Sequence, residues 1–216
     1  SNRFLQNRFA GELLYHCRDT SLLDPGKYDP AEIKRRLGLE NKKIVMFLGT
    51  PRGHKGVEDL IEAMNHVRTP NARLVIVGAG DDMTAHSDKV KIVSKISFAE
   101  LGEYLSSADI VAIPQRRTSD TVGQMPAKIF DAMAMAKPII TTPVSDIPEV
   151  LEDCGYLVEP GNPRQLAEKI DYVFEHEEEA RAKGQEARAR CVRLYDLKVL
   201  EKQLLALVKK FGKKQD

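Results

Sequence analysis

Short apolar runs recur along the chain from residue 43 onward. They are rich in Val, Ile and Leu, show almost no alternation with polar residues, and occupy residues 43–49, 73–78, 90–94, 109–114, 138–142 and 155–159. Runs of this length without polar alternation are typical of strands that are buried on both faces, as in a parallel sheet. The pattern therefore predicts a buried sheet of about six strands.

Segments with helical periodicity separate these apolar runs, at residues 57–67, 98–108, 126–136 and 147–153. Strands that alternate with helices predict an α/β fold, a Rossmann-like doubly wound parallel sheet with right-handed crossovers. Three extra helices follow the last strand, at residues 163–176, 177–195 and 197–211. The last of them carries an apolar stripe on one side, which is typical of an amphipathic helix.

The first 30 residues do not follow this pattern. Only residues 13–15 form a short run that is compatible with a strand, and a loop rich in Asp, Pro and Gly follows it. The chain also begins without Met. We therefore expect a piece of a longer protein, whose opening segment does not complete a domain.

Charge and cysteine content exclude several classes of function. The 33 basic and 32 acidic residues give a net charge of +1, which offers no electrostatic case for binding nucleic acid. The three cysteines are far apart and lack C-x-x-C spacing, so we expect no zinc site, no disulfide framework and a cytoplasmic location. No apolar run approaches the roughly 18 residues of a transmembrane segment, and no signal peptide is visible.

The loop at residues 49–56, GTPRGHKG, follows the first predicted strand and precedes a helix. Ligands of open α/β sheets bind outside the carboxyl ends of the strands, and a helix N-terminus there attracts anions. Arg52 and Lys55 would add charge-assisted hydrogen bonds to a phosphate. The loop matches neither the Walker A nor the G-x-G-x-x-G pattern. A solvated turn without a ligand is an equally good reading of this stretch alone.

The loop at residues 114–126 is long for its position, and long loops at this edge of a sheet tend to be functional. Pro126 suits the first turn of the next helix. Lys128 and Asp131 are three positions apart, so they project from one face of that helix. The alternative is an exposed ion pair worth about 0.5 kcal/mol. The sequence has no D-x-D motif and no spacing typical of a catalytic nucleophile with its base.

Taken in order, these segments resemble the C-terminal, donor-binding half of GT-B-fold glycosyltransferases, specifically the retaining enzymes of glycosyltransferase family 4. The resemblance covers almost the whole chain, through residues 15–25, 47–64, 74–80, 91–114, 123–150 and 155–170. It implies three parts. Residues 1–40 would be the end of an N-terminal domain with an interdomain segment, 41–195 the nucleotide-sugar-binding domain, and 196–216 a C-terminal helix with a basic tail.

The resemblance also implies a site for the diphosphate of the donor. Gly49 and Lys55 match the family's phosphate loop. The family's arginine usually follows the glycine, where this chain has Thr50, so Arg52 would substitute for it. Lys128 falls in a P-x-K arrangement and would add a further positive charge at the diphosphate.

Three more roles come from the same resemblance. Asp131 stands at the second acidic position of the E-x7-E signature, which is expected to bind the ribose hydroxyls. The first acidic position falls on Gly123, and nearby Asp120 is a candidate catalytic carboxylate. The backbone N–H groups that would face the sugar or phosphate beside Gly123 belong to Gln124, Met125 and Ala127. The residues expected beside the base are Lys95 and Ile96.

The implied activity is transfer of a sugar, with retention, from a nucleotide-sugar to a glycan or lipid-linked acceptor in polysaccharide biosynthesis. The donor would carry UDP or GDP, and neither a metal nor a cofactor is expected. The acceptor site, and any peripheral contact with a membrane, would lie in the missing N-terminal domain, so the fragment alone would transfer poorly or not at all. Two alternatives remain open: a non-catalytic nucleotide-binding or scaffold protein, and a GT-B-fold sugar-nucleotide epimerase.

Overall fold

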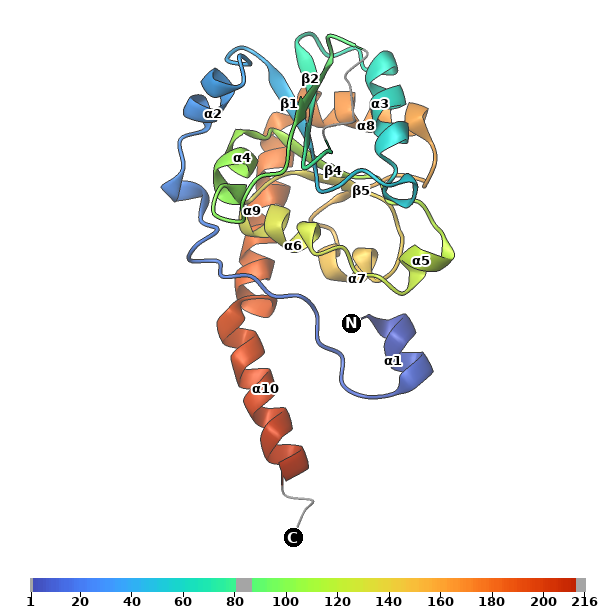
Figure 1. Cartoon of the computed structure of the whole chain (residues 1–216), viewed down its shortest axis with the longest axis vertical. Coiled ribbons are helices and arrows are strands. Elements are labelled where there is room, and N and C mark those ends of the chain that lie inside the picture. Colours follow the sequence, from blue (N-terminus) through green and yellow to red (C-terminus); the bar gives the residue numbers. More distant parts are fainter. Residues whose placement is uncertain (1, 81–86, 213–216) are drawn as a thin grey trace.

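The computed structural model describes residues 2–80 and 87–212, and a single parallel sheet forms its centre (Figure 1). The strands lie in the order β3-β2-β1-β4-β5-β6. Their bounds are β1 (Lys43–Leu48), β2 (Ala72–Val77), β3 (Val90–Val93), β4 (Ile110–Ile113), β5 (Ile139–Thr141) and β6 (Tyr156–Leu157). Each strand lies within, or one residue beyond, the run that predicts it. The predicted doubly wound sheet of six strands is therefore confirmed.

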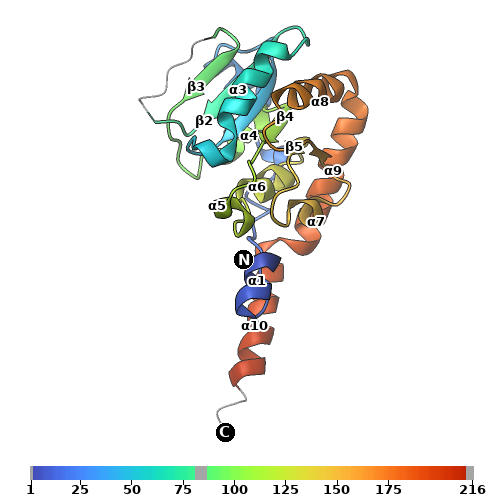
Figure 2. The same ribbon diagram turned by 90° about the vertical axis from the view of Figure 1, so that its right-hand side faces the viewer.

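Helices cover both faces of the sheet (Figures 1 and 2). One face packs against α3 (Val57–His66) and α8 (Pro163–Glu175). The other packs against α2 (Pro30–Arg36), α4 (Leu101–Ser107), α6 (Lys128–Ala134), α7 (Ile147–Leu151) and α9 (Glu177–Leu194). The described helices outside these two layers are α1 (Arg3–Phe9), α5 (Ser119–Val122) and α10 (Leu197–Gly212).

The central strand shows why the apolar runs do not alternate with polar residues. Val45 and Phe47 point into the core beneath α3 and α8, while Ile44 and Met46 point into the core on the opposite face. All four side chains are fully buried. Because both faces of the sheet are covered at this point, β1 is apolar and buried from Ile44 to Leu48.

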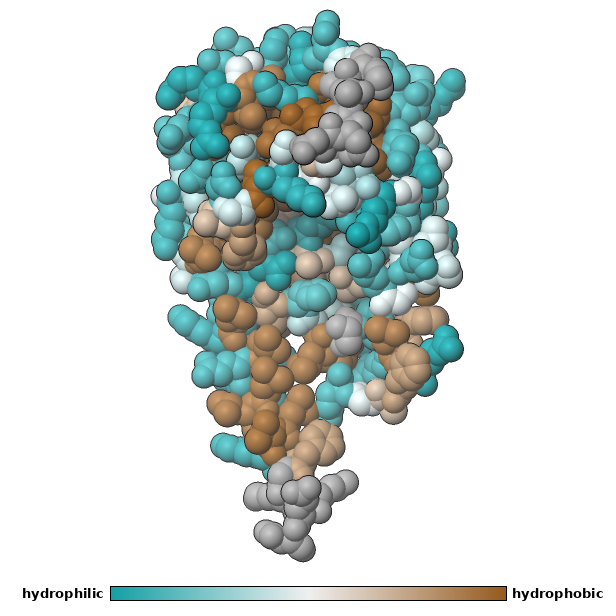
Figure 3. Space-filling view, in the orientation of Figure 1, coloured by the Kyte–Doolittle hydropathy of each residue, from teal (hydrophilic) through white to brown (hydrophobic). Residues whose placement is uncertain are grey.

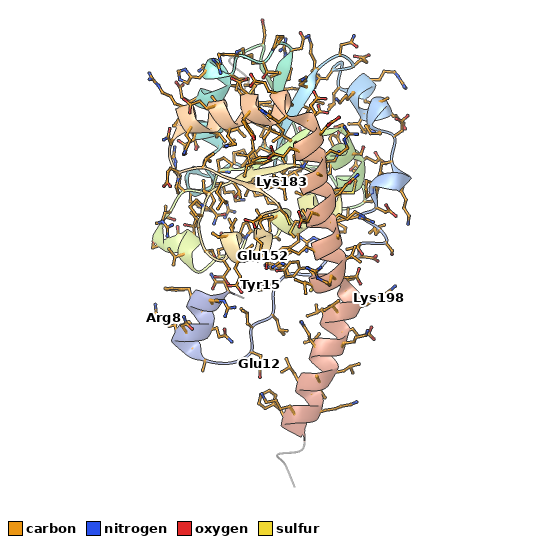
Figure 4. The ribbon with its side chains drawn as sticks, turned by 180° about the vertical axis from the view of Figure 1, so that it is seen from behind. Arg8, Glu12, Tyr15, Glu152, Lys183 and Lys198 are labelled. Atoms are coloured by element: carbon orange, nitrogen blue, oxygen red, sulfur yellow. The ribbon has the colours of Figure 1, made fainter. Side chains whose placement is uncertain are left out.

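The N-terminal segment differs most from the prediction. Residues 13–15 form no strand in the described structure. Tyr15 instead lies at the edge of the body near α10, where its hydroxyl donates a hydrogen bond to Asp146 (2.7 Å; Figure 4). The segment preceding it forms α1, which begins after Asn2; the Asn2 side chain accepts from the Leu5 N–H (3.1 Å).

Two further helices were not predicted. α2 begins with Asp29 as its N-cap and Pro30 in its first turn, a recognisable start signal, and Ile33 places it in the core of the α/β body. α5 is a single turn inside the long loop after β4, closed by a capping box between Thr118 and Thr121. The domain boundary expected after residue 40 stays a prediction.

The last helix, α10, extends well beyond the α/β body, which it leaves near Lys198 (Figures 1, 2 and 4). Its exposed apolar side chains form a patch visible in Figure 3, and they are Leu197, Leu204, Leu205, Val208 and Phe211. Lys210 on this helix pairs with Glu12 (2.6 Å). None of the described helices is both long and apolar enough to cross a membrane. The end of the expected basic tail, residues 213–216, lies outside the described residues.

Two loops at the carboxyl edge of the sheet are held in direct contact. Arg116, after β4, makes a bidentate ion pair with Asp59 of α3 (2.6 and 2.7 Å). Gly56, at the start of α3, has φ +68°, and a Cβ atom there would lie 1.9 Å from the carbonyl oxygen of Pro114. The loop after β1 and the loop after β4 therefore fit together only if residue 56 has no side chain.

We expect Gly56→Ala to lower the free energy of unfolding by about 3 kcal/mol, because it adds left-handed strain and a clash with Pro114. Urea unfolding of the variant measures this. Gly53→Ala, three residues earlier, is the matched control; a Cβ there meets nothing within 4 Å, so its effect should stay within about 0.5 kcal/mol. Equal stability of the two variants would contradict the predicted contact.

Candidate functional site

A cavity of about 560 Å³ opens at the carboxyl edge of the sheet. It lies where the strand order reverses between β1 and β4, the position at which doubly wound sheets bind ligands. The loops after β1, β2, β3 and β4 and the first turns of α6 form its wall. Its lining residues are Leu48, Gly49, Thr50, Lys55, Val77, Gly78, Lys95, Ile96, Ser97, Phe98, Leu101, Gln115, Gln124, Pro126, Ala127, Lys128 and Asp131.

Lys55 provides the first positive charge of the cavity. Its ammonium donates a hydrogen bond to the carbonyl of Thr50 (3.0 Å), which folds the side chain back over the loop. Gly49 has a φ of +105°, a left-handed conformation that favours glycine, so the loop turns there without strain. Burial, and to a smaller extent the nearby Arg52 guanidinium, lower the pKa of Lys55. The cavity thus holds a partly desolvated cation.

Lys128 provides the second positive charge and is the more unusual of the two. Its Nζ is buried and, within the described residues, has no hydrogen-bond partner. It lies 3.9 Å from the centroid of the Phe47 ring, a cation–π contact that replaces only part of the lost hydration. Burial and the nearby Lys55 lower the pKa of Lys128 to about 7, against the opposing effect of Asp131. An anion in the cavity would remove this penalty.

The Asp131 carboxylate makes its ion pair elsewhere. Arg18, from the segment before the sheet, binds both carboxylate oxygens through Nε and Nη2 and also donates to the carbonyl of Ala127 (3.1 Å). The two side chains are mostly buried, with 15% and 9% exposed. The exposed Lys128–Asp131 pair considered from the sequence is therefore not present; instead Arg18 orients the carboxylate at the cavity wall.

The loop after β3 forms the apolar end of the cavity. Lys95 and Ile96 both line it, as the predicted contact with a base requires, and Phe98 and Leu101 extend the apolar surface. The N–H and hydroxyl of Ser97 both donate to Glu100 (2.9 and 2.8 Å). This end can therefore hold a flat, partly apolar group.

The residues after Gly123 reach the cavity to different extents. Gln124 and Ala127 line it, whereas Met125 is buried beside it, with 4% of its surface exposed. The N–H of Gln124 already donates to the carbonyl of Thr121 (3.1 Å), so it does not face a ligand as expected.

Besides Met125, three of the predicted residues do not line the cavity. Arg52 and Asp120 are exposed, Asp120 on α5. Gly123 faces α1, because a Cβ there would lie 3.5 Å from the Phe4 ring and 3.6 Å from the Leu5 side chain. The position at which the family has its first glutamate is therefore directed at the N-terminal helix.

Arg18 and Gln115 belong to the site but were not predicted. Arg18 lies 113 positions from Asp131, a separation that no local pattern reveals. Gln115 follows β4 directly, so its place at a strand end was the available signal. Its amide nitrogen, like Lys128 Nζ, is buried without a hydrogen-bond partner in the part of the chain that the structure describes.

Comparison with known sequences identifies the family. The sequence profile described as "Glycosyl transferases group 1" matches residues 42–176, which include every strand of the sheet. The chain belongs to this family. N-acetyl-alpha-D-glucosaminyl L-malate synthase of Bacillus anthracis is 29% identical over 173 residues, which are 75% of this chain and 44% of that enzyme. The chain spans about half the length of the curated relatives it matches.

Solved structures show the same GT-B-type fold at lower identity. HepE of Anabaena in complex with UDP and glucose is 20% identical with a TM-score of 0.83, over 97% of this chain and 62% of that one. The C-terminal domain of the group 1 family protein LpcC of Francisella tularensis is 20% identical with a TM-score of 0.70. It matches 83% of this chain and 99% of the domain. The chain therefore corresponds to a C-terminal domain of this family.

We expect Lys128→Met to stabilise the unliganded protein more at pH 6 than at pH 9. Unfolded Lys128 keeps its proton up to its ordinary pKa of 10.5, whereas the folded protein releases it near 7. Between these values the unfolded state binds more protons, so this group makes parental stability rise with pH. Below pH 7 the full cost of burying the ammonium is present.

The difference in the free energy of unfolding between Lys128→Met and the parent should therefore decrease by about 2–3 kcal/mol from pH 6 to pH 9, as measured by urea unfolding. Lys202→Met, at an exposed position on α10, is the control and should show no such narrowing. A constant difference between Lys128→Met and the parent would contradict the buried position of the amine.

We expect Arg18 and Asp131 to be coupled by about 1–3 kcal/mol in a double-mutant cycle of alanine variants, because the pair is mostly buried. Thermal or urea unfolding supplies the four stabilities. The exposed pair Arg36–Glu103 (3.3 Å) is the control and should show a coupling below about 1 kcal/mol. Equal coupling energies in the two cycles would contradict the prediction that the buried Arg18–Asp131 pair contributes more than an exposed pair.

Proposed function

We propose that this chain is the donor-binding half of a glycosyltransferase that uses a nucleoside-diphosphate sugar. One observation carries the proposal: two partly or fully buried amines, Lys55 and Lys128, share a cavity at the carboxyl edge of the sheet. Burying two cations close together is unfavourable unless an anion joins them. A diphosphate is an anion of suitable charge for this place.

The remaining parts of the cavity fit the other parts of such a donor. The base would lie at the apolar end beside Ile96, and the ribose hydroxyls would donate to Asp131. Arg18 occupies both carboxylate oxygens, but each oxygen retains a further lone pair that can accept from a hydroxyl. Gly49 lets the diphosphate approach the backbone closely.

The chemistry follows from this placement. The bond between the sugar and the distal phosphate breaks, and negative charge develops on the departing nucleoside diphosphate. Lys55 and Lys128 stabilise that charge electrostatically. We propose transfer with retention and without a metal. The candidate catalytic carboxylate, Asp120, is exposed on α5 and does not line the cavity.

The relatives support a nucleotide-sugar donor. HepE of Anabaena has been solved with UDP, with UDP-glucose, and with UDP and glucose. The name of another relative, alpha-D-kanosaminyltransferase of Streptomyces kanamyceticus, describes transfer of a sugar; it is 24% identical. Uridine diphosphate sugars are therefore the first donors to test, with guanosine diphosphate sugars second.

The acceptor would be bound by the half of the protein that is not in this chain. The relatives are about twice as long as the matched region, and the cavity described above accounts for the donor alone. A glycan or lipid-linked acceptor, and any contact with a membrane, belong to the complete protein in this proposal. The chain alone should bind donor and transfer little sugar.

Calorimetric titration with UDP-, GDP- and ADP-sugars tests the proposal. We expect one of them to bind the parent, and Lys55→Ala and Asp131→Ala each to weaken that binding by roughly 10-fold to 100-fold, the effect of one hydrogen bond to a charged group. Lys202→Ala, on α10 and far from the cavity, should bind as the parent does.

Absence of binding by the parent would overturn the proposal. So would binding that neither Lys55→Ala nor Asp131→Ala weakens. Circular dichroism of each variant excludes unfolding as the cause of a loss.

A non-catalytic nucleotide-binding protein is the second candidate. The observation that favours it is the direction of Gly123, since the first acidic position of the family points at α1 and carries no carboxylate. The two candidates differ in the complete protein, where only a transferase would release nucleoside diphosphate from a donor in the presence of acceptor.

A further inference from the structure

The backbone of Gln115, a polar residue of the cavity, is fixed by hydrogen bonds on both sides. Gln115 follows β4 directly, and only 3% of its surface is exposed. Its N–H donates to the carbonyl of Ile113 (2.9 Å), and its own carbonyl accepts from the hydroxyl of Thr142 (2.6 Å). The next residue, Arg116, is fixed to Asp59 by its bidentate ion pair. The backbone thus holds this side chain in one place.

The side chain itself is not satisfied. Its amide nitrogen is buried and, among the described residues, donates no hydrogen bond, although the residue lines the cavity. A buried donor without a partner is costly, and native structures retain few of them. The other buried side-chain polar atom in this condition, over residues 2–80 and 87–212, is Lys128 Nζ in the same cavity. The two unpaired donors thus belong to residues that line the same cavity, so one ligand could accept from both.

The order of the strands shows which part of the ligand Gln115 meets. The base-binding loop follows β3, and Gln115 follows β4, three strands away in the sheet. Neighbouring strands are about 4.8 Å apart, so the two ends of the site are separated by roughly 14 Å. With the base beside Ile96, the diphosphate lies over β1, and its distal phosphate is the part nearest β4.

We propose that the Gln115 carboxamide binds the distal phosphate of the nucleoside-diphosphate donor. The inference rests on the proposed function and adds a binding residue to it. Rotation about the side-chain torsions of Gln115 would turn an amide N–H toward the phosphate without moving the backbone. The phosphate oxygen accepts from this neutral donor and from the ammonium of Lys128.

The neutrality of the amide is part of the inference. Lys55 and Lys128 already repel each other, since the positive charge of Lys55 lowers the pKa of Lys128. A third cation at position 115 would increase that repulsion in the unliganded protein, and a carboxylate would repel the phosphate. An amide adds a hydrogen bond without adding charge.

Titration of two variants at position 115 and one control variant with UDP and with UMP tests this role. We expect Gln115→Leu to weaken UDP binding about 10-fold or more and Gln115→Glu about 100-fold, while binding of UMP, which lacks the distal phosphate, changes less than about twofold for Gln115→Leu. Gln203→Leu, at an exposed position on α10, is the control and should bind both nucleotides as the parent does.

Stability separates ligand binding from a structural role. If Gln115 serves the ligand, Gln115→Leu removes an unsatisfied donor and leaves the melting temperature unchanged or raised. A lower melting temperature together with unaltered UDP affinity would show a structural residue and overturn the inference. Equal weakening of UDP and UMP would also overturn it, by excluding the distal phosphate. Failure of the parent to bind any nucleotide would instead overturn the proposed function.

Discussion

The closure of both faces of the sheet is the constraint on which the rest of the structure depends. Because helices cover Val45 and Phe47 on one side and Ile44 and Met46 on the other, the central strand β1 presents no polar side chain on either face from Ile44 to Leu48. Chemistry is confined to the strand ends, and the reversal of strand order between β1 and β4 opens a hollow at one of these ends. The loops after β1 and β4 are then fixed against each other by Gly56 and Arg116.

In this cavity, two buried polar groups without a hydrogen-bond partner lower the stability of the unliganded protein. Lys128 keeps an ammonium over an aromatic ring without a hydrogen-bond partner among the described residues, and Gln115 keeps an unsatisfied amide. Asp131 is different, because Arg18 compensates its charge in the absence of ligand. The cavity thus contains two polar groups without a partner, on Lys128 and Gln115, and one carboxylate, on Asp131, that the protein itself pairs with Arg18.

The strands and most helices followed from the sequence because their signals are local. Continuous apolar runs identified the six described strands. The loop after the first strand pointed to Lys55, and the family resemblance added Lys95 and Asp131, which line the same cavity. Arg18 could not be found in this way, because its role depends on a contact across 113 residues. The directions of Gly123 and Asp120 also depend on tertiary packing, on α1 and α5 respectively. The burial of Gln115 Nε2 is likewise a property of the fold and not of its neighbours in sequence.

The contact between Arg18 and Asp131 has a consequence for where this protein can be divided. A cut at residue 41, just before β1, would retain every strand but would remove α2 from the core and the guanidinium from the Asp131 carboxylate. The smallest piece that preserves the cavity together with its Arg18–Asp131 ion pair must therefore begin upstream of Arg18. The segment that looks like a linker along the sequence is, in three dimensions, part of the unit that forms the cavity.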